Sequence, residues 1–443
     1  MMFNSDEILK AAGAELVKNI SQSDDFDIST DTRTIKKGEL YLPLKGVSFD
    51  GEDFLDNAIA SGAEGCFITK DYFPKDTKIV FKVKDTLETY LKLANYYRYK
   101  INPVVVAVTG SSGKTTTKEM IFAVLSENFK THKTFSNHNN EIGFCQTVLS
   151  MPEDCEVLIV EMGMRGFGEI ELLSKYAEPD YAVITNAGSA HIGRLGSLDN
   201  IAKAKCEIVK YLKKEGSFIA QNNERIKKFA DFDGEKIYYS VDDVEVLERK
   251  PSYSKFVYKG KEYELSVEGD YNIENSLSAI TMAYKLGMSY EKIRKGLASY
   301  KPIEKRWEVQ DIRGYKIIND SYNANPDSMK AAVSAFVQLY KYPVVVLGDM
   351  GELGESEQEL HKQVGEYLST VAPKTCKFLT VGHLAEKIGI PLQEKGFYVK
   401  NFENNEEAAE FMLANIDAGN TIFLKASRSM KFEEIIEKFK GEV

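Results

Sequence analysis

Short runs of branched apolar residues alternate with stretches of helical periodicity through the middle of the chain. Three runs have the length and composition of strands buried on both faces, and they lie at 104–108, 157–160 and 182–185. Helical patterns lie between and after them, at about 114–128, 168–176, 199–213, 273–286 and 290–299. Strands that alternate with helices predict a parallel sheet wound with helices.

The pattern differs on either side of this middle block. The first hundred residues mix short strands with helices and end in a predicted helix at 86–99, stopped by Asn102-Pro103. After Arg306, a predicted hairpin at 307–318 turns at Arg313-Gly314. Strands then alternate with helices again, with strands at 343–347, 377–381, 397–400 and 421–425 and helices at 327–340, 356–369, 383–388, 405–416 and 431–440.

These blocks predict an α/β protein of three domains. The first is an α/β module at 1–102, the second a central parallel sheet wound with helices at 103–304, and the third a Rossmann-like domain at 305–443. A length of 443 residues suits three domains of ordinary size.

Composition narrows the classes of protein that remain. With 43% hydrophobic residues, 28% charged residues and a net charge of −10, the chain is globular and has no general attraction to nucleic acid or anionic membranes. No apolar stretch is long enough to span a membrane, and the N-terminus lacks a basic segment followed by an apolar one. Five cysteines without a CxxC pair indicate reduced, buried thiols, and five histidines show no zinc spacing. We expect a cytoplasmic monomer that binds neither nucleic acid nor membrane.

A phosphate-binding loop follows the first strand of the middle block and opens a helix. Its residues are Gly110, Ser111, Ser112, Gly113, Lys114, Thr115 and Thr116. Glycines let backbone amides approach phosphate, Lys114 can reach the terminal phosphates, and Thr115 can bind Mg²⁺. The full Walker pattern has glycine where this chain has Val108, so the match covers the second part of the pattern.

Three other residues of the middle block are candidates for the same site. Glu161 follows a strand, where its carboxylate is placed to bind Mg²⁺, and His191 lies after the next strand. Lys205 lies on the predicted helix at 199–213. Each residue alone is more often structural than catalytic, so the loop predicts a bound nucleotide without deciding the reaction.

Taken together, these motifs resemble the Mur ligase family, the ATP-dependent amide ligases of peptidoglycan precursor synthesis. The resemblance covers the whole chain and rests on residues 109–116, 161–163, 185–191, 201–208, 270–275, 305–308 and 319–326. Four blocks look like the last-acting member of the family: 137–143, 319–326, 348–354 and 425–430. That member joins D-alanyl-D-alanine to UDP-N-acetylmuramoyl-tripeptide through an acyl phosphate.

The resemblance implies roles for the matching residues. Lys114 and Thr115 would serve the phosphates of ATP and Mg²⁺, with Glu161 and His191 helping to hold two metal ions. Lys205 aligns with a lysine that is carbamylated in relatives, and Lys203 is the competing candidate.

Residues outside the loop would complete the nucleotide site. Asn272 and Asn275 match a pair near the adenine, and Arg306 and Asp320 match groups that reach the nucleotide from across the cleft. Tyr322 stands where some members carry lysine, so the role of that position is open. The implied catalytic residues are Lys114, His191, Lys205 and Arg306.

Candidate substrate residues lie in all three blocks. Five resemble the module that binds the uridine diphosphate of the substrate: Thr32, Arg33, Lys45, Gly46 and Asp50. Three belong to the motif of the last-acting member: Asn137, Asn139 and Asn140. The dipeptide carries a free carboxylate, which needs a cation and hydrogen-bond donors, and the third block offers Asn323, Asn325, Ser427 and Arg428. This arrangement requires the third block to swing in and close the cleft.

Two other functions are compatible with a phosphate-binding loop. The chain could be another ligase of the superfamily, such as a folylpolyglutamate synthetase, although residues 137–140 and 320–326 argue against it. It could also be a P-loop ATPase without ligase activity. No residue identifies whether the tripeptide ends in meso-diaminopimelate or L-lysine.

Overall fold

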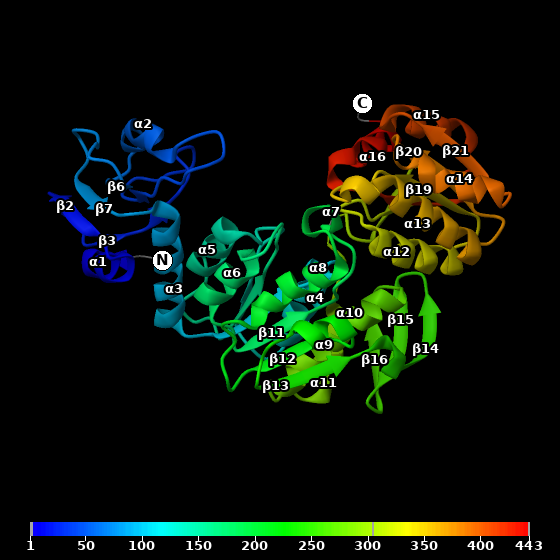
Figure 1. Ribbon diagram of the computed structural model, residues 1–443, viewed down its shortest axis with the longest axis horizontal. Coiled ribbons are helices and arrows are strands. Elements are labelled where there is room, and N and C mark those ends of the chain that lie inside the picture. Colours follow the sequence, from blue (N-terminus) through cyan, green and yellow to red (C-terminus); the bar gives the residue numbers. More distant parts are fainter. Residues whose placement is uncertain (1–2, 304, 442–443) are drawn as a thin grey trace.

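The computed structural model describes residues 3–303 and 305–441 and consists of three α/β domains. The N-terminal domain lies at one end of the elongated molecule, the central domain in the middle, and the C-terminal domain at the other end (Figure 1). The three-domain α/β fold predicted from the sequence is therefore confirmed. The proposed boundary at residue 304 lies outside the described residues.

The N-terminal domain contains a mixed five-stranded sheet in the order β2-β7-β6-β5-β4 and a separate β1-β3 pair. Its helix α3 ends in Asn102, whose left-handed conformation (φ 55°) caps the helix before Pro103. The elements are β1 (Phe3–Asn4), α1 (Ser5–Ala12), β2 (Glu15–Asn19), β3 (Asp25–Phe26), β4 (Ile28–Ser29), β5 (Leu40–Tyr41), α2 (Leu55–Ala60), β6 (Gly65–Ile68), β7 (Ile79–Lys82) and α3 (Thr86–Ile101).

The central domain is built on a six-stranded parallel sheet in the order β13-β12-β11-β8-β10-β9. Its strands are β8 (Val104–Thr109), β9 (Thr131–Lys133), β10 (Val157–Glu161), β11 (Tyr181–Ile184), β12 (Ser217–Gln221) and β13 (Glu235–Tyr239). Its helices are α4 (Lys114–Leu125), α5 (Glu141–Leu149), α6 (Glu169–Ala177), α7 (Ile192–Leu195), α8 (Leu198–Cys206), α9 (Glu224–Phe229), α10 (Asp270–Lys285) and α11 (Tyr290–Ser299). An antiparallel sheet of β14 (Val244–Lys250), β15 (Tyr253–Tyr258) and β16 (Lys261–Leu265) packs beside α10 and α11.

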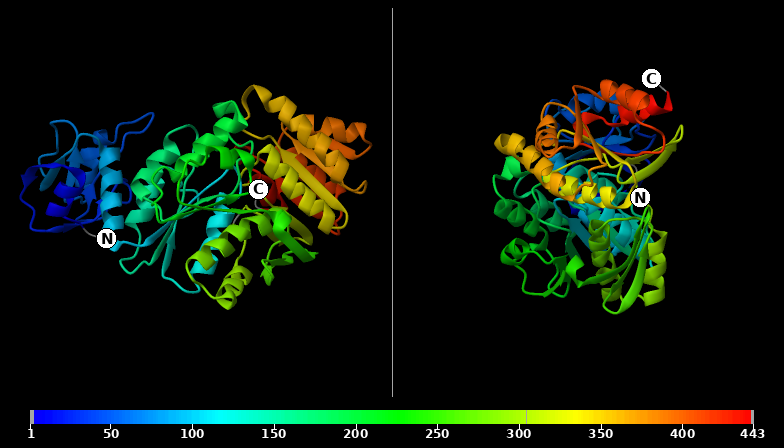
Figure 2. Two further views of the ribbon diagram at one scale, coloured as in Figure 1. Left: turned by 60° about the horizontal axis from the view of Figure 1, so that its bottom comes forward. Right: turned by 90° about the vertical axis from the view of Figure 1, so that its right-hand side faces the viewer.

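The C-terminal domain contains a second six-stranded sheet, in the order β17-β18-β22-β19-β20-β21. Only the β17–β18 hairpin is antiparallel. The strands are β17 (Glu308–Ile312), β18 (Tyr315–Asn319), β19 (Pro343–Gly348), β20 (Lys377–Val381), β21 (Tyr398–Phe402) and β22 (Thr421–Lys425). The helices are α12 (Pro326–Leu339), α13 (Glu357–Val371), α14 (Glu386–Glu394), α15 (Asn405–Asn415) and α16 (Glu433–Lys440), and they cover both faces of the sheet (Figure 2).

Strand register in the central sheet decides where the functional loops meet. The last residue of β10, Glu161, pairs with Val108, and Ile184 of β11 pairs with Thr109 on the other side of β8. The loops that follow β8, β10 and β11 therefore leave the same edge of the sheet. Ligands of open parallel sheets bind at this edge.

Two expectations about elements need correction. The helix predicted at 199–213 is α-helical only to Cys206 and continues as a 3₁₀ helix over Glu207–Val209, where the Glu207 carboxylate accepts hydrogen bonds from the Gly168 amide (2.9 and 3.0 Å) at the start of α6. The helix predicted at 383–388 is α14, which begins later and extends through Pro391.

One expectation from composition is met. All five cysteines are free and buried. In the part of the chain that the structure describes, no helix combines the length and apolar character of a membrane span.

Candidate active site

The loop between β8 and α4 is held in place by the loop that follows β11. Thr185 Oγ1 donates to the Ser112 carbonyl (2.6 Å), and the Ser112 amide donates to Asn186 Oδ1 (3.1 Å). Ser111 Oγ donates to the Gly188 carbonyl (2.9 Å). These bonds fix the loop at the positive end of α4, where an anion is stabilised.

Both glycines of this loop are required by close approach. A methyl group on Gly110 would lie 1.8 Å from Thr185 Oγ1. Gly113 has a left-handed backbone (φ 74°), and a methyl group there would lie 2.5 Å from Asn275 Oδ1. The glycines therefore let the loop, β11 and α10 meet around one space.

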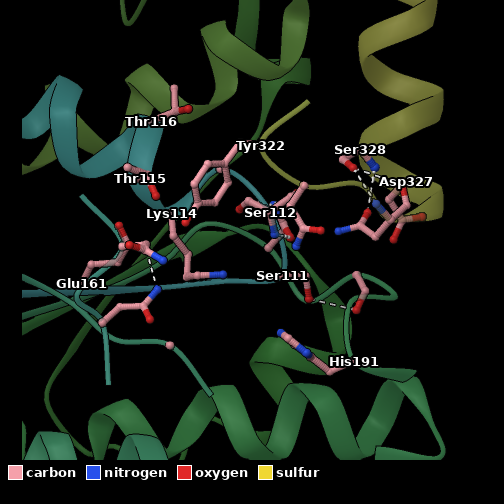
Figure 3. A pocket seen from close by; sticks show the side chains of 18 of the residues that line it. Ser111, Ser112, Lys114, Thr115, Thr116, Glu161, His191, Tyr322, Asp327 and Ser328 are labelled. Carbon is pink, nitrogen blue, oxygen red and sulfur yellow. Dashed lines mark hydrogen bonds between the residues drawn. The ribbon is translucent and has the colours of Figure 1, made fainter. Parts of the chain in front are cut away.

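A cavity of about 1390 Å³ opens at this edge, between the central and C-terminal domains (Figure 3). Most of the candidate residues of these two domains line it. They are Ser111, Ser112, Gly113, Lys114, Thr115, Thr116, Asn137, Asn139, Asn140, Glu161, His191, Asn272, Asn275, Arg306, Asp320, Asn323 and Asn325.

Lys114 extends into the cavity and folds back over its own loop (Figure 3). Its Nζ donates to the Gly110 carbonyl (2.9 Å). Burial lowers the pKa of Lys114, the nearby Glu161 carboxylate opposes that shift, and the Arg306 guanidinium adds to it. An anionic ligand at the loop would favour the charged ammonium by the same electrostatics.

Glu161 is buried, and one of its two carboxylate oxygens accepts no hydrogen bond from the described residues. Its side chain is buried, Asn139 Nδ2 donates to Oε1 (2.9 Å), and Oε2 has no hydrogen-bond partner among the described residues. The nearest cation to Oε2 is Lys118 Nζ, at 3.7 Å. A buried carboxylate oxygen without a donor is costly, and a divalent cation would satisfy it.

Lys118 was not expected from the sequence. It is fully buried on α4, one turn after Lys114, and its Nζ donates to the carbonyls of Thr134 (2.7 Å) and Ser136 (3.2 Å). These bonds fix the start of the segment that carries Asn137 and Asn139. The spacing from Lys114 places both lysines on one helix face, which the sequence could have indicated.

The structure separates the two lysines of α8. Lys203 is exposed, with its ammonium 5.1 Å from the centre of the Phe229 ring. Lys205 is 1% exposed, and among the described residues its Nζ has no hydrogen bond or ion pair. Burial and the charge of Lys114 hold the pKa of Lys205 well below its usual range. Lys205 is not among the residues that line the cavity.

The C-terminal domain places two charged side chains opposite the phosphate loop. The guanidinium of Arg306 stacks on the Tyr322 ring at 4.0 Å from the ring centre, and its Nε is buried without a partner among the described residues. Asp320 pairs with the buried Lys425 (2.5 Å), which the sequence did not single out as a candidate.

The two asparagines expected near adenine lie on α10. Both Asn272 and Asn275 are buried and line the cavity, and Asn272 Nδ2 donates to the Glu268 carbonyl (2.7 Å). The asparagines Asn140 and Asn325 also cap helices, because their side chains accept from the amides of Gly143 (3.0 Å) and Ser328 (2.9 Å).

Several candidates lie away from this cavity. Ser427 is buried and donates to the Asp349 carbonyl (2.6 Å), whereas Arg428 is exposed and pairs with Glu433 (2.5 Å). The candidates of the N-terminal domain do not line this cavity either. They are Thr32, Arg33, Lys45, Gly46 and Asp50. Arg33 makes a bidentate pair with Asp31, which lowers the pKa of Asp31 to about 2. Asp50 pairs with Lys70 (2.8 Å).

His191 forms a contact between the domains. It has a left-handed backbone (φ 66°), and its Nδ1 lies 2.6 Å from the Glu352 carboxylate of the C-terminal domain. Among the described residues no three His, Cys, Asp or Glu side chains form a ready metal site.

The fold and the site define a class: a P-loop nucleotide-binding enzyme with a Rossmann-like domain facing its cleft. Three family models match along the chain: "Mur ligase family, catalytic domain" at residues 27–98, "Mur ligase middle domain" at 108–283 and "Mur ligase, glutamate ligase domain" at 305–428. The chain belongs to the Mur ligase family.

Named relatives match over nearly the whole chain. The chain is 37% identical to the UDP-N-acetylmuramoyl-tripeptide–D-alanyl-D-alanine ligase of Bacillus subtilis, over 96% of both chains. It is 32% identical to the ligase of the same name from Escherichia coli, over 92% of each. Among solved structures it is similar to MurF from Acinetobacter baumannii, with a TM-score of 0.91, 28% identity, and coverage of 100% of this chain and 99% of that one. MurF ligase from Thermotoga maritima in complex with ADP has a TM-score of 0.83 and 26% identity, with 94% and 97% covered.

Proposed function

We propose that this chain is the ligase that adds D-alanyl-D-alanine to UDP-N-acetylmuramoyl-tripeptide and so forms the UDP-N-acetylmuramoyl-pentapeptide of peptidoglycan synthesis. The carrying observation is 37% identity to a ligase of that name over 96% of both chains. The cavity supports the same reaction, since it joins a phosphate loop to charged residues of a second domain.

Amide formation from a carboxylate requires an activated acyl group. The terminal carboxylate of the tripeptide attacks the γ-phosphorus of ATP, the bond to ADP breaks, and an acyl phosphate forms. The amine of D-alanyl-D-alanine then attacks the acyl carbon, loses a proton, and phosphate leaves. Lys114, Arg306 and the amides of the phosphate loop stabilise the negative charge that the reacting phosphoryl group carries.

Mg²⁺ would be held by the residues whose donors fit it: Thr115 on the first turn of α4, Glu161 and His191. The main support for this proposal is Oε2 of Glu161. A buried carboxylate oxygen that accepts no hydrogen bond is a suitable ligand for a hard cation. When bound, Mg²⁺ supplies positive charge that offsets the repulsion between the phosphates and the attacking carboxylate.

Lys205 is proposed to act as a carbamate. A neutral amine attacks the carbon of CO₂, a C–N bond forms, and the nitrogen loses a proton to give an anion on a long arm. The reaction needs a neutral amine, which burial and the charge of Lys114 favour by lowering the pKa of Lys205, and the exposed Lys203 lacks that burial. The resulting carboxylate oxygens would serve a second Mg²⁺.

The adenine is placed against α10, where Asn272 and Asn275 line the cavity. The N-terminal domain, residues 1–102, is proposed to bind the uridine diphosphate of the substrate. Lys45 and Asp50 pair across a tight turn there, with Gly46 donating to the Phe49 carbonyl (3.0 Å). Its exposed amides and Arg33 offer donors to the diphosphate.

The dipeptide is assigned to the C-terminal domain, at residues 305–443. Asn323 and Asn325 line the cavity, whereas Arg428 lies outside it. We propose that the C-terminal domain closes on the central domain, at residues 103–304, once ATP and the tripeptide are bound. The enzyme is further proposed to act as a monomer in the cytoplasm.

Phosphate release tests the function directly. A ligase releases phosphate from ATP only when both the UDP-linked tripeptide and D-alanyl-D-alanine are present, whereas a P-loop ATPase without ligase activity needs neither. Product mass with tripeptides ending in meso-diaminopimelate or L-lysine identifies the acceptor. A product from glutamate and a folate would instead indicate a folylpolyglutamate synthetase.

A further inference from the structure

A turn of the C-terminal domain reaches across the cleft to a residue of the central domain. Glu352 Oε2 lies 2.6 Å from His191 Nδ1, and Oε1 lies 3.4 Å from Arg194 Nε. The Gly193 amide donates to the Glu352 carbonyl (3.1 Å). Both Glu352 and His191 line the cavity.

The backbones of the two domains also approach each other closely beside this contact. A methyl group on Gly193 would lie 2.4 Å from the Gly354 amide nitrogen. A second contact lies nearby, where the amide and hydroxyl of Ser189 both donate to Asp327 Oδ2 (2.7 Å each). The loop that carries His191 is therefore docked on the C-terminal domain at two points.

The turn that presents Glu352 is rigidly supported from within its own domain. Ser427 donates to the Asp349 carbonyl through both its amide (3.1 Å) and its hydroxyl (2.6 Å). The Met350 amide donates to Nε2 of the buried His361 (2.9 Å). Glu352 itself has a left-handed backbone (φ 62°), which an L-residue adopts at a cost.

A carboxylate beside one ring nitrogen is a common feature of histidines that bind cations. A histidine that binds a cation through one ring nitrogen usually donates its other N–H to a carboxylate or carbonyl, which fixes the tautomer and the ring orientation. Glu352 Oε2 lies within reach of a proton on Nδ1, and a proton held there would leave Nε2 with its lone pair for a cation.

We infer that Glu352 is a positioning residue that completes the cation site from the neighbouring domain. It orients His191, so the site reaches full affinity only when the C-terminal domain is docked. This inference rests on the proposed function, because that function places a divalent cation at His191. Ser427 would then contribute to the cation site indirectly, because it holds the turn that carries Glu352.

Cation affinity can be measured without turnover. The full-length protein is titrated with Mn²⁺ in the presence of a non-hydrolysable ATP analogue, and free Mn²⁺ is read by electron paramagnetic resonance. We expect Glu352→Ala to weaken Mn²⁺ binding roughly 10- to 100-fold. Glu352→Gln keeps an oxygen acceptor for Nδ1–H, so it should restore most of the affinity.

Two controls separate positioning from general damage. Glu355→Ala removes an exposed carboxylate of the same turn and should leave Mn²⁺ affinity unchanged. Combining Glu352→Ala with His191→Ala should cost no more than His191→Ala alone, because Glu352 acts through His191. Thermal unfolding of each variant confirms that the chain is folded.

Several outcomes would overturn the inference. Unchanged affinity in Glu352→Ala would show that the contact only joins the domains. Tighter binding would show that Glu352 sequesters His191 from the cation, and additive losses in the double variant would show that it acts elsewhere. Failure of the proposed function looks different, because the wild-type protein would then yield no pentapeptide by mass while its Mn²⁺ titration remained interpretable.

Discussion

Replacing Lys205 with methionine tests the chemical state of a buried amine. Lys205 is 1% exposed, and no described residue offers Nζ a hydrogen bond or ion pair. An unpaired ammonium would cost several kcal/mol in such surroundings, and burial together with the charge of Lys114 lowers the pKa of Lys205, which favours the neutral amine. Methionine has a similar volume and no charge, so Lys205→Met removes the nitrogen with little change in packing.

Stability should change little in Lys205→Met, whereas activity should fall strongly. We expect the free energy of unfolding to change by less than about 1.5 kcal/mol, the usual limit for a volume-conserving apolar replacement. We expect kcat to fall by about 10²–10³, or roughly 2.7–4 kcal/mol in the barrier, which is the typical cost of losing one preorganised electrostatic group.

The assays are urea unfolding and phosphate release with ATP, UDP-linked tripeptide and D-alanyl-D-alanine. Lys203→Met, on the exposed face of the same helix, is the matched control and should keep its activity. Acetate should partly restore Lys205→Ala, since it supplies the missing anion. A carbamate would also give a carbon resonance after incubation with ¹³C-bicarbonate that Lys205→Met lacks.

Two results would refute the reasoning. A variant that keeps more than about a tenth of kcat, a loss under roughly 1.4 kcal/mol, would remove Lys205 from the machinery. A loss of about 3–5 kcal/mol in unfolding free energy would show that Lys205 is a paired ammonium, because that is the cost of breaking a buried ion pair.

Three further predictions follow from single contacts. Lys114→Ala should lower kcat more than tenfold, over about 1.4 kcal/mol in the barrier, with an unchanged melting temperature; near-normal phosphate release would exclude Lys114. Lys425→Met leaves Asp320 without its buried partner and should cost about 3–5 kcal/mol in urea unfolding; a cost under ~1 kcal/mol would show that solvent replaces Lys425. Burial lowers the pKa of His361, so its contribution to stability is present above about pH 6.5 and is lost as pH falls below it. His361→Gln should flatten this part of the stability–pH curve, and an unchanged slope would show that His361 does not cause it.

Much of the fold was predictable because the strands in the core can be recognised from their apolar sequences. The strands β8, β10, β19 and β22 are almost entirely buried, and each contains at least three consecutive apolar residues. The antiparallel sheet β14–β16 was missed, because its strands are partly exposed and contain many charged residues, as in Val244–Lys250. The lengths of helices were less certain, since α8 changes to a 3₁₀ helix at Glu207, whose carboxylate also accepts from the Gly168 amide at the start of α6.

The site residues were predictable where a reactive side chain belongs to a known motif or comes directly after a buried strand. Lys114, Thr115 and Glu161 were indicated by a motif or by their place after a buried strand, and the structure brings them to one cavity. Lys118 and Glu352 were missed, because their importance depends on partners that are distant in sequence.

The distance between Ser427 and the cavity shows how a motif can act indirectly. Ser427 is an expected substrate residue, yet both of its polar groups hold the Asp349 carbonyl, three residues before Glu352. Glu352 in turn faces His191 across the cleft, and Lys425 of the same segment holds Asp320 at the cavity wall. A substitution in the segment 425–430 can therefore alter the nucleotide site without contacting a substrate. The contacts that join the two domains would then also set the geometry of the charges in the cavity, which would couple catalysis to the position of the C-terminal domain.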